Sequence, residues 1–171
     1  KKFDQAAVWY KRKYVAETNA SMNVRITNLN AYAKALYMNK EYSRSDSAYT
    51  AVIALDSTLT YGWLGRAQSQ NRMDGDGAPK GLGRPYYERY MAIANADSVA
   101  RVKNKKDIVT ASVYLGSIHA REKNYACAKA YYTLAHELDA TNAAANDALD
   151  NNKDIKAATA AEIGTCVLPK K

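Results

Sequence analysis

The chain has 171 residues, of which 47% are hydrophobic and 25% are charged, and its formal net charge is +8. A domain of this length buries roughly 70% of the surface of its unfolded chain, so stability requires neither disulfides nor a metal. No apolar run approaches the roughly 18 residues that a membrane span needs, and we expect no span. The sequence starts without Met and inside a helical pattern, so we expect it to be part of a longer protein.

The basic residues lie in separate clusters, at 1–2, 11–13, 101–106 and 170–171. A nucleic-acid-binding protein is expected to gather positive charge on one face, with exposed aromatic side chains or a known motif. Scattered basic residues on helices are usually just solvated. We therefore expect no nucleic-acid partner, and nucleic-acid binding is only a third hypothesis, beside a role as an accessory domain of an enzyme.

Helical periodicity runs through nearly the whole chain, and no alternation of apolar and polar residues lasts long enough to predict a strand. Abundant alanine, with Gly 8 and Pro 3, also favours helices. The first segment, residues 1–20, contains FDQAAVWYKRKY, in which Ala6 and Tyr10 have a spacing that returns later in the chain. The chain is predicted to be all-α.

Two segments of the chain match each other along their whole length. Residues 41–58 (EYSRSDSAYTAVIALDST) align with residues 124–141 (NYACAKAYYTLAHELDAT), which pairs Tyr42 with Tyr125, Tyr49 with Tyr132, Leu55 with Leu138 and Asp56 with Asp139. A small residue precedes each aromatic by the same spacing, Ala33 before Tyr49 and Gly116 before Tyr132. A large ring needs a small residue on the antiparallel neighbouring helix, where the two backbones come close. Each unit is therefore predicted to be a helical hairpin.

A third and longer copy lies between these two. It contains YGWLGRAQSQNRMD and GRPYYERYMAIA, but Gly65 and Tyr87 are farther apart than the matching residues of the other copies, which indicates an inserted loop. A polar C-terminal segment has the character of a cap that protects the last apolar face of a helical array. The predicted organisation is a first hairpin at 23–58, a second at 59–97 with the inserted loop at 74–83, a linker at 98–108, a last hairpin at 109–141, and a capping helix and tail at 142–171.

These hairpins resemble tetratricopeptide repeats (TPRs), whose first helix follows W-x2-L-G-x2-Y and whose second helix follows A-x3-F-x2-A before a terminal Pro. The last hairpin matches this pattern at Leu115, Gly116, Ala128, Tyr132 and Ala135. It departs from the pattern where His119 replaces the usual Tyr and Ala140 the Pro. The resemblance implies a right-handed superhelical solenoid of antiparallel helix pairs, with three repeats and with residues 1–20 as the second helix of a truncated preceding repeat.

The repeat with the insertion contains PYYE and is followed by NKKD, an arrangement similar to TPR arrays in envelope proteins of Bacteroidetes. This similarity favours the periplasm or the cell envelope over the cytoplasm.

The side chains that suggest a reactive or metal site are His119, Cys127 and His136. His119 takes a place that a packing aromatic normally fills, and Cys127 precedes the buried-type Ala128, so we interpret both as structural. No CxxC or paired-histidine spacing indicates zinc, and no motif supplies the base and oxyanion site that a nucleophilic cysteine needs. Cys127 and Cys166 could pair as a disulfide outside the cytoplasm, although two unpaired thiols are the favoured interpretation.

The inserted loop imitates two ligand-binding loops and completes neither. Asp74 and Asp76 resemble the start of a calcium loop, but Ala78 and Pro85 occupy later ligand positions. Lys80 lies in a Gly-rich stretch, yet no strand precedes it and GK[ST] is absent. We interpret the loop as a turn that leads into the next helix.

In the TPR family, the first helices of the repeats line an inner groove that binds peptides of partner proteins. The resemblance implies a groove lined by Asn30, Lys34 and Tyr37, then Trp63, Arg66 and Gln70, then Tyr114, Ser117 and Arg121. Trp, Tyr and Arg often dominate binding energy, so Trp63 is the expected anchor, and the basic groove residues favour an acidic partner. The carboxylate clamp that some family members use to bind chaperone termini is not reproduced, because Trp63, Thr110 and Tyr114 replace its residues.

The predicted function is a non-catalytic scaffold for protein–protein interaction that holds no metal and needs no cofactor. The alternative is an architectural module that stacks on the rest of its own chain or associates with itself. The first hypothesis predicts an external ligand, and the second predicts self-association or docking within the chain.

Overall fold

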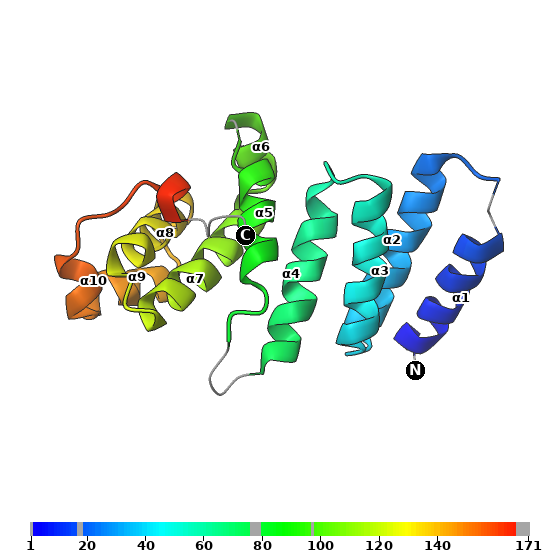
Figure 1. The fold of residues 1–171 in the computed structure, drawn as a ribbon, viewed down its shortest axis with the longest axis horizontal. Coiled ribbons are helices and arrows are strands. Elements are labelled where there is room, and N and C mark those ends of the chain that lie inside the picture. The colour runs from blue at the N-terminus through cyan, green and yellow to red at the C-terminus, as the bar shows by residue number, and fades with distance from the viewer. Residues whose placement is uncertain (1, 17–18, 76–79, 97, 167–171) are drawn as a thin grey trace. The chain divides into compact units, whose positions relative to one another are not determined.

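The computed structural model describes residues 2–16, 19–75, 80–96 and 98–166. Every regular element among these residues is helical, which confirms the predicted all-α fold (Figure 1). The helices are α1 (Lys2–Ala16), α2 (Met22–Met38), α3 (Tyr42–Leu55), α4 (Thr60–Asp74), α5 (Arg84–Ala94), α6 (Ser98–Lys103), α7 (Lys105–Arg121), α8 (Tyr125–Leu138), α9 (Ala143–Asn151), α10 (Lys153–Ala157) and the 3₁₀ helix η1 (Ile163–Cys166).

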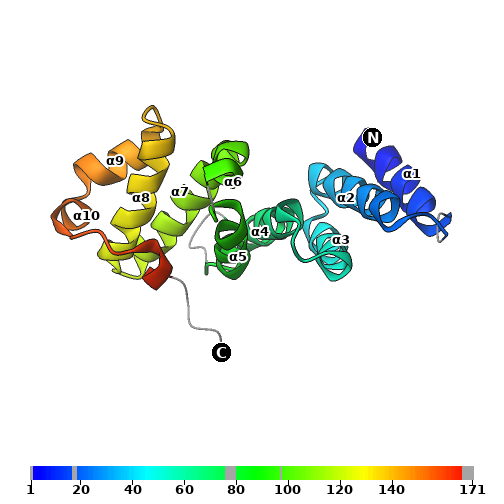
Figure 2. The same ribbon diagram turned by 90° about the horizontal axis from the view of Figure 1, so that it is seen from above.

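The chain divides into two compact units, residues 1–86 and 87–171. Unit 1 contains α1 to α4, and each of these helices packs on the next one in the chain (Figures 1 and 2). In unit 2, α7 packs on α8, and α8 in turn contacts α9, α10 and η1. The boundary between the units falls within α5, inside the range 59–97 that the sequence predicts as one repeat.

The core of unit 1 is centred on α2, whose apolar side chains recur at helical spacing. The buried cluster contains Ile26, Leu29, Ala33 and Leu36 from α2, Ala7 from α1, and Ala48, Tyr49 and Val52 from α3. Because α2 buries side chains against both α1 and α3, it holds these two helices in place on either side of it.

Two pairs of neighbouring helices pack closely where a glycine on one helix faces a tyrosine ring on the other. A Cβ atom added to Gly116 of α7 would lie 3.0 Å from the ring of Tyr132 on α8, which confirms the predicted small-and-large pair in the last hairpin. In unit 1, a Cβ atom added to Gly65 of α4 would lie 2.2 Å from the ring of Tyr49 on α3. Burial of this ring raises the pKa of Tyr49 to about 12. Both glycines therefore leave the space that a neighbouring ring fills.

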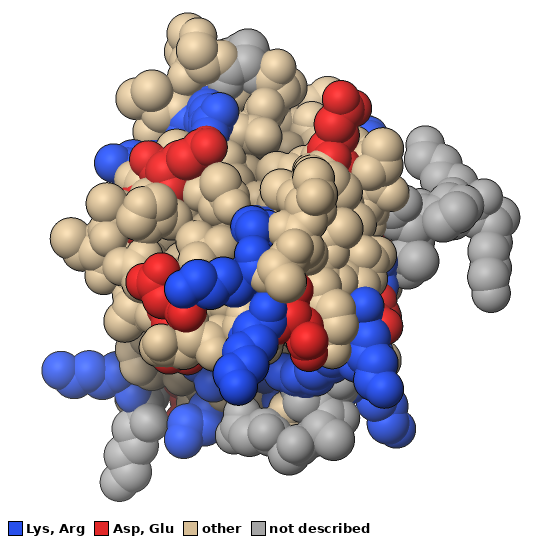
Figure 3. Space-filling view, turned by 90° about the vertical axis from the view of Figure 1, so that its left-hand side faces the viewer, with Lys and Arg blue, Asp and Glu red and all other residues tan. Residues whose placement is uncertain are grey.

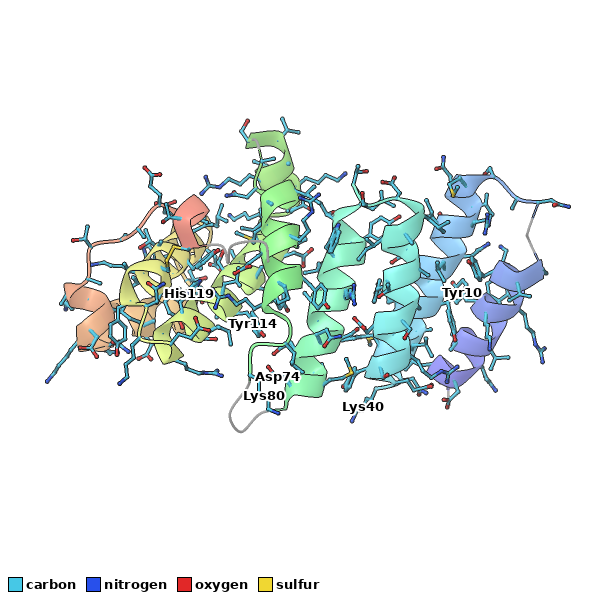
Figure 4. The ribbon with its side chains drawn as sticks, viewed as in Figure 1. Tyr10, Lys40, Asp74, Lys80, Tyr114 and His119 are labelled. Carbon is cyan, nitrogen blue, oxygen red and sulfur yellow. A yellow bond between two sulfur atoms is a disulfide. The ribbon has the colours of Figure 1, made fainter. Side chains whose placement is uncertain are left out.

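The tight turns inside the two matching hairpins have the same backbone conformation. Lys40 and Lys123 are the residues with positive φ, at 64° and 59°, among the non-glycine residues described (Figure 4 labels Lys40). The next residue in each turn donates its N–H across the turn, Glu41 to the Leu36 carbonyl and Asn124 to the His119 carbonyl, each at 2.9 Å. The sequence match thus extends to the hydrogen bonds of the turns.

The ends of the second helices also match. Asp56 follows α3 and Asp139 follows α8, and each carboxylate accepts hydrogen bonds from the hydroxyl and N–H of a threonine two residues later. These bonds, the one from the hydroxyl first, lower the pKa of both aspartates. Asp56 and Asp139, which the sequence match pairs, thus follow equivalent helices and make the same hydrogen bonds.

The C-terminal part of unit 2 covers one side of the last hairpin. Ala145 of α9 and Ile155 of α10 are buried in a cluster with Val109 of α7 and with Ala128, Tyr132 and Ala135 of α8. Asn142 and Asn152 begin α9 and α10, and their side chains accept hydrogen bonds from the first N–H groups of those helices. The range 98–108, predicted as a linker, contains α6 and the first residues of α7.

Cys127 of α8 and Cys166 of η1 form a disulfide, with 5.5 Å between their Cα atoms. The interpretation of these residues as two unpaired thiols is therefore wrong. The chain turns back after α10 and returns to α8, where the N–H of Ala161 donates to the carbonyl of Ala126 at 3.1 Å. This return brings together two cysteines that are 39 residues apart in the sequence.

Candidate functional site

The predicted groove residues of α2 lie along one side of that helix. Lys34 is exposed, and Asn30 and Tyr37 are partly exposed. The Tyr37 ring packs edge-on against Tyr42 with 5.5 Å between ring centroids. Its hydroxyl accepts a hydrogen bond from Nε of Arg72 on α4 at 3.3 Å. Arg72 thus joins α2 to α4 beside the predicted residues.

Arg72 was missed by sequence reasoning. The groove residues of α4 were predicted at spacings of three and four residues, which place side chains on one helix face. Arg72 lies six positions after Arg66, so these spacings do not include it. The signal that could have found it is its place near the end of α4, where a long side chain can reach the neighbouring first helix.

The predicted groove residues of α4 make contacts inside unit 1. Nε1 of Trp63 donates to the carbonyl of Ser57 at 2.9 Å, which ties the indole to the segment before its own helix. Nε of Arg66 pairs with the Asp46 carboxylate at 3.0 Å, and both side chains are largely buried, with 23% and 15% exposed. Trp63 and Arg66 therefore contribute to the structure of unit 1.

The Arg66 guanidinium also lies over the ring of Tyr86, 4.2 Å from the ring centroid. A cation above an aromatic face is attracted by the ring quadrupole. Together with the ion pair, this contact fixes the guanidinium between two partners of its own unit. Gln70, the third predicted residue of α4, is partly exposed.

The remaining predicted residues belong to α7 in unit 2. The Tyr114 ring packs against Tyr87 with 4.6 Å between centroids, and Ser117 donates to the Tyr114 carbonyl at 2.7 Å. Arg121 is exposed near the end of the helix. Six of the nine predicted residues thus lie in unit 1 and three in unit 2, and their use as one binding surface stays a prediction.

The histidines and the cysteine considered as a reactive trio have separate partners. His119 is buried and stacks on Tyr131 with 5.5 Å between centroids (Figure 4 labels His119). Cys127 is in the disulfide, and His136 shares a hydrogen bond with Asn146 at 2.7 Å. Within the described residues, no group of three or more His, Cys, Asp and Glu side chains could hold a metal ion.

Asp74 organises the inserted loop. Its carboxylate accepts hydrogen bonds from the N–H groups of Lys80, Gly81 and Leu82 at 2.8, 2.7 and 3.0 Å (Figure 4). Burial acts to raise the pKa of Asp74, but these N–H donors outweigh it and hold the pKa below its ordinary value. Asp76 and Ala78, which entered the comparison with a calcium loop, lie outside the described residues.

The structure also contains a cleft in unit 1 that sequence reasoning did not identify. It has a volume of about 770 Å³, lies between α1 and the start of α3, and reaches Tyr32 of α2. From α1 it is lined by Val8, Lys11, Arg12 and Val15. These residues have i, i+3, i+4, i+7 spacing, which was the signal available in the sequence.

Charge is mixed on the end of the molecule that Figure 3 faces, where lysine and arginine side chains lie among aspartate and glutamate. Within unit 2, Glu137 of α8 pairs with Arg101 of α6 at 3.4 Å. No helix in the described part of the chain is long and apolar enough to cross a membrane.

The fold is a helical repeat of the TPR-like class, and the comparison with solved structures supports this assignment. The structure is similar to the crystal structure of the C-terminal part of a TPR repeat-containing protein from Cytophaga hutchinsonii, with a TM-score of 0.64 and 23% sequence identity. The similarity covers 86% of this chain and 60% of the other chain. Comparison of the sequence with protein-family models and with curated proteins gives no match.

Proposed function

We propose that the chain is a non-catalytic scaffold that binds a partner protein or peptide through the first helices of its hairpins. The observation that carries this proposal is the contact between α2 and α4, the first helices of two hairpins predicted from the sequence, which are joined by the hydrogen bond from Arg72 to Tyr37. Two neighbouring helices held in this way offer a rigid surface, which lowers the entropy cost of binding.

The side chains on this surface favour an acidic partner. Lys34 is exposed on α2, and Arg72 is exposed on α4. Tyr37 contributes an aromatic face between them, and aromatic and arginine side chains are the types most often found at the centre of interfaces. A carboxylate placed between Lys34 and Arg72 would gain charge-assisted hydrogen bonds.

The test uses the whole protein as bait in an extract of its native cells, with bound proteins quantified by mass spectrometry. Lys34→Glu reverses one charge on the proposed surface, and Lys153→Glu makes the same change at an exposed position on α10. A partner that is lost with Lys34→Glu and kept with Lys153→Glu supports the proposal. Partners that are captured equally by both variants contradict it.

Trp63 and Arg66 are unsuitable for this test, although the sequence points to them. Removing either side chain breaks contacts with Ser57 or Asp46 inside unit 1. Loss of one partner of a largely buried ion pair is destabilising, so reduced capture would not separate binding from folding.

An architectural role is the second candidate, because α1 exposes large apolar side chains. Phe3 is 44% exposed and Trp9 is 55% exposed. If this face joins two copies of the chain, Trp9→Asp should convert a dimer into a monomer in light scattering. A monomer for both the wild type and the variant would reject self-association through this face.

A further inference from the structure

We propose a second binding site, separate from the surface of α2 and α4: the cleft between α1 and α3 binds an acidic, amphipathic helix of a partner protein. The cleft volume of about 770 Å³ lies within the range of pockets that bury whole ligand side chains. None of the nine groove residues predicted from the sequence lines it.

The floor and one wall of the cleft are apolar. Val8 and Val15 of α1 are 51% and 60% exposed, and Ala7 and Tyr32 continue the apolar surface toward α2. Val8 and Val15 are two helical turns apart, a separation of ~10 Å along the axis. Leucines spaced three and four residues apart on a partner helix form an apolar stripe of similar length. Amphipathic helices bind in grooves by packing such a stripe against an apolar surface.

Basic side chains border this stripe on both sides. At 3.6 residues per turn, Lys11 and Arg12 each lie ~50° around the axis of α1 from the line through the two valines, on opposite sides of it. Both side chains are exposed, and neither forms an ion pair within the described residues. Two unpaired positive charges flanking an apolar stripe are complementary to a helix with acidic residues beside its apolar face.

The acidic residues of the cleft are already engaged by the protein. Glu41 pairs with Arg44 and accepts a hydrogen bond from Asn39 at 2.7 Å. Asp4 accepts from the same amide at 2.5 Å. Arg44 also donates to the Tyr32 hydroxyl at 3.2 Å, so its guanidinium is held at the wall opposite α1. The lining holds three basic side chains (Lys11, Arg12 and Arg44) against two acidic ones (Asp4 and Glu41), and the unpaired Lys11 and Arg12 favour an acidic helix over a basic one.

The experiment measures fluorescence anisotropy of a labelled peptide of about 14 residues, ~21 Å long as a helix. The peptide carries leucine at positions three and four apart, glutamate beside them and alanine elsewhere. A matched peptide has lysine in place of glutamate. The expected result with the full chain is saturable binding in the micromolar range for the glutamate peptide, and at least tenfold weaker binding for the lysine peptide.

Three variants locate the binding. Val15→Asp places a charge in the apolar stripe, and the double variant Lys11→Glu and Arg12→Glu reverses the flanking charges; each should weaken binding of the glutamate peptide at least tenfold. Trp9→Ala changes a side chain on α1 that is as exposed as Val8 but does not line the cleft, and it should leave binding unchanged. Circular dichroism checks that helix content is preserved in all three.

Equal binding of the two peptides, or binding that survives Val15→Asp and the charge reversal, overturns the proposal. So does a dimer of the unliganded chain that Val15→Asp dissociates, because the occupant would then be a second copy. Lys34→Glu on α2 should not affect the peptide, so failure of this proposal and failure of the proposed scaffold surface are distinguishable.

Discussion

Replacing Cys127 and Cys166 by alanine removes the covalent connection between α8 and η1. Both cysteines are buried, at 5% and 3% exposure, and alanine at these positions leaves no unpaired polar group. The principal effect should be on the unfolded chain, because the disulfide closes a loop between residues that are 39 positions apart. In the loop-closure model, opening a loop of about 40 residues costs ~4 kcal/mol of stability at 25 °C.

Hydrogen exchange of α8 measures this loss in the intact chain. A decrease of ~4 kcal/mol corresponds to exchange that is faster by nearly three powers of ten for the slowest amides of α8, if they exchange through unfolding of unit 2. The amides of α2 are an internal control, because α2 lies in unit 1. An increase below tenfold in α8, or an equal increase in α2, would refute the idea that the disulfide stabilises unit 2.

Gly65→Ala should destabilise unit 1 by about 2 kcal/mol in urea unfolding, because the new Cβ would lie 2.2 Å from the Tyr49 ring, and overpacking outweighs the gain in helix propensity. A neutral result would mean that the ring moves at no cost. Lys40→Gly should raise stability by about 1 kcal/mol in the same assay, since φ is 64° at this residue, whereas Lys40→Ala should not. Asp74→Ala should make hydrogen exchange of the amides of residues 80–82 about tenfold faster, which corresponds to a loss of ~1.4 kcal/mol in the free energy of opening the loop. Because the pKa of Asp74 is lowered on folding, its contribution should be present above the ordinary pKa of 3.8 and be lost as the pH falls through the folded value; protection that is the same at pH 2 and pH 6 would contradict this.

The packing of α2 on α3 and of α7 on α8 could be predicted from the sequence because its signals are local. The spacing of Gly116 and Tyr132 reflects a contact inside one hairpin, and the matching positions of Asp56 and Asp139 reflect turns of a few residues. Each of these features repeats, and repetition distinguishes a structural requirement from chance.

The disulfide and the contacts of the predicted groove residues could not be predicted in the same way. Pairing of Cys127 with Cys166 depends on how the segment after α10 returns to α8, which no short-range spacing encodes. The burial of Arg66 depends on Asp46, a residue of the preceding helix, and on Tyr86 beyond the inserted loop. Helical spacing places a residue on a face, but the neighbouring helix decides whether that face is available to a ligand.

The matching turns at Lys40 and Lys123 have a consequence for how such a chain can change in length. Each turn is closed by bonds between its own backbone groups, so it needs nothing from other hairpins to form. A gene segment that encodes one hairpin could be duplicated or exchanged without changes to the turn that connects its two helices. The same holds for the inserted loop, because Asp74 binds its far end through backbone N–H groups, which every residue except proline supplies. Variation in length can thereby be accommodated in the connections, while the helices that carry the proposed binding surfaces keep their register.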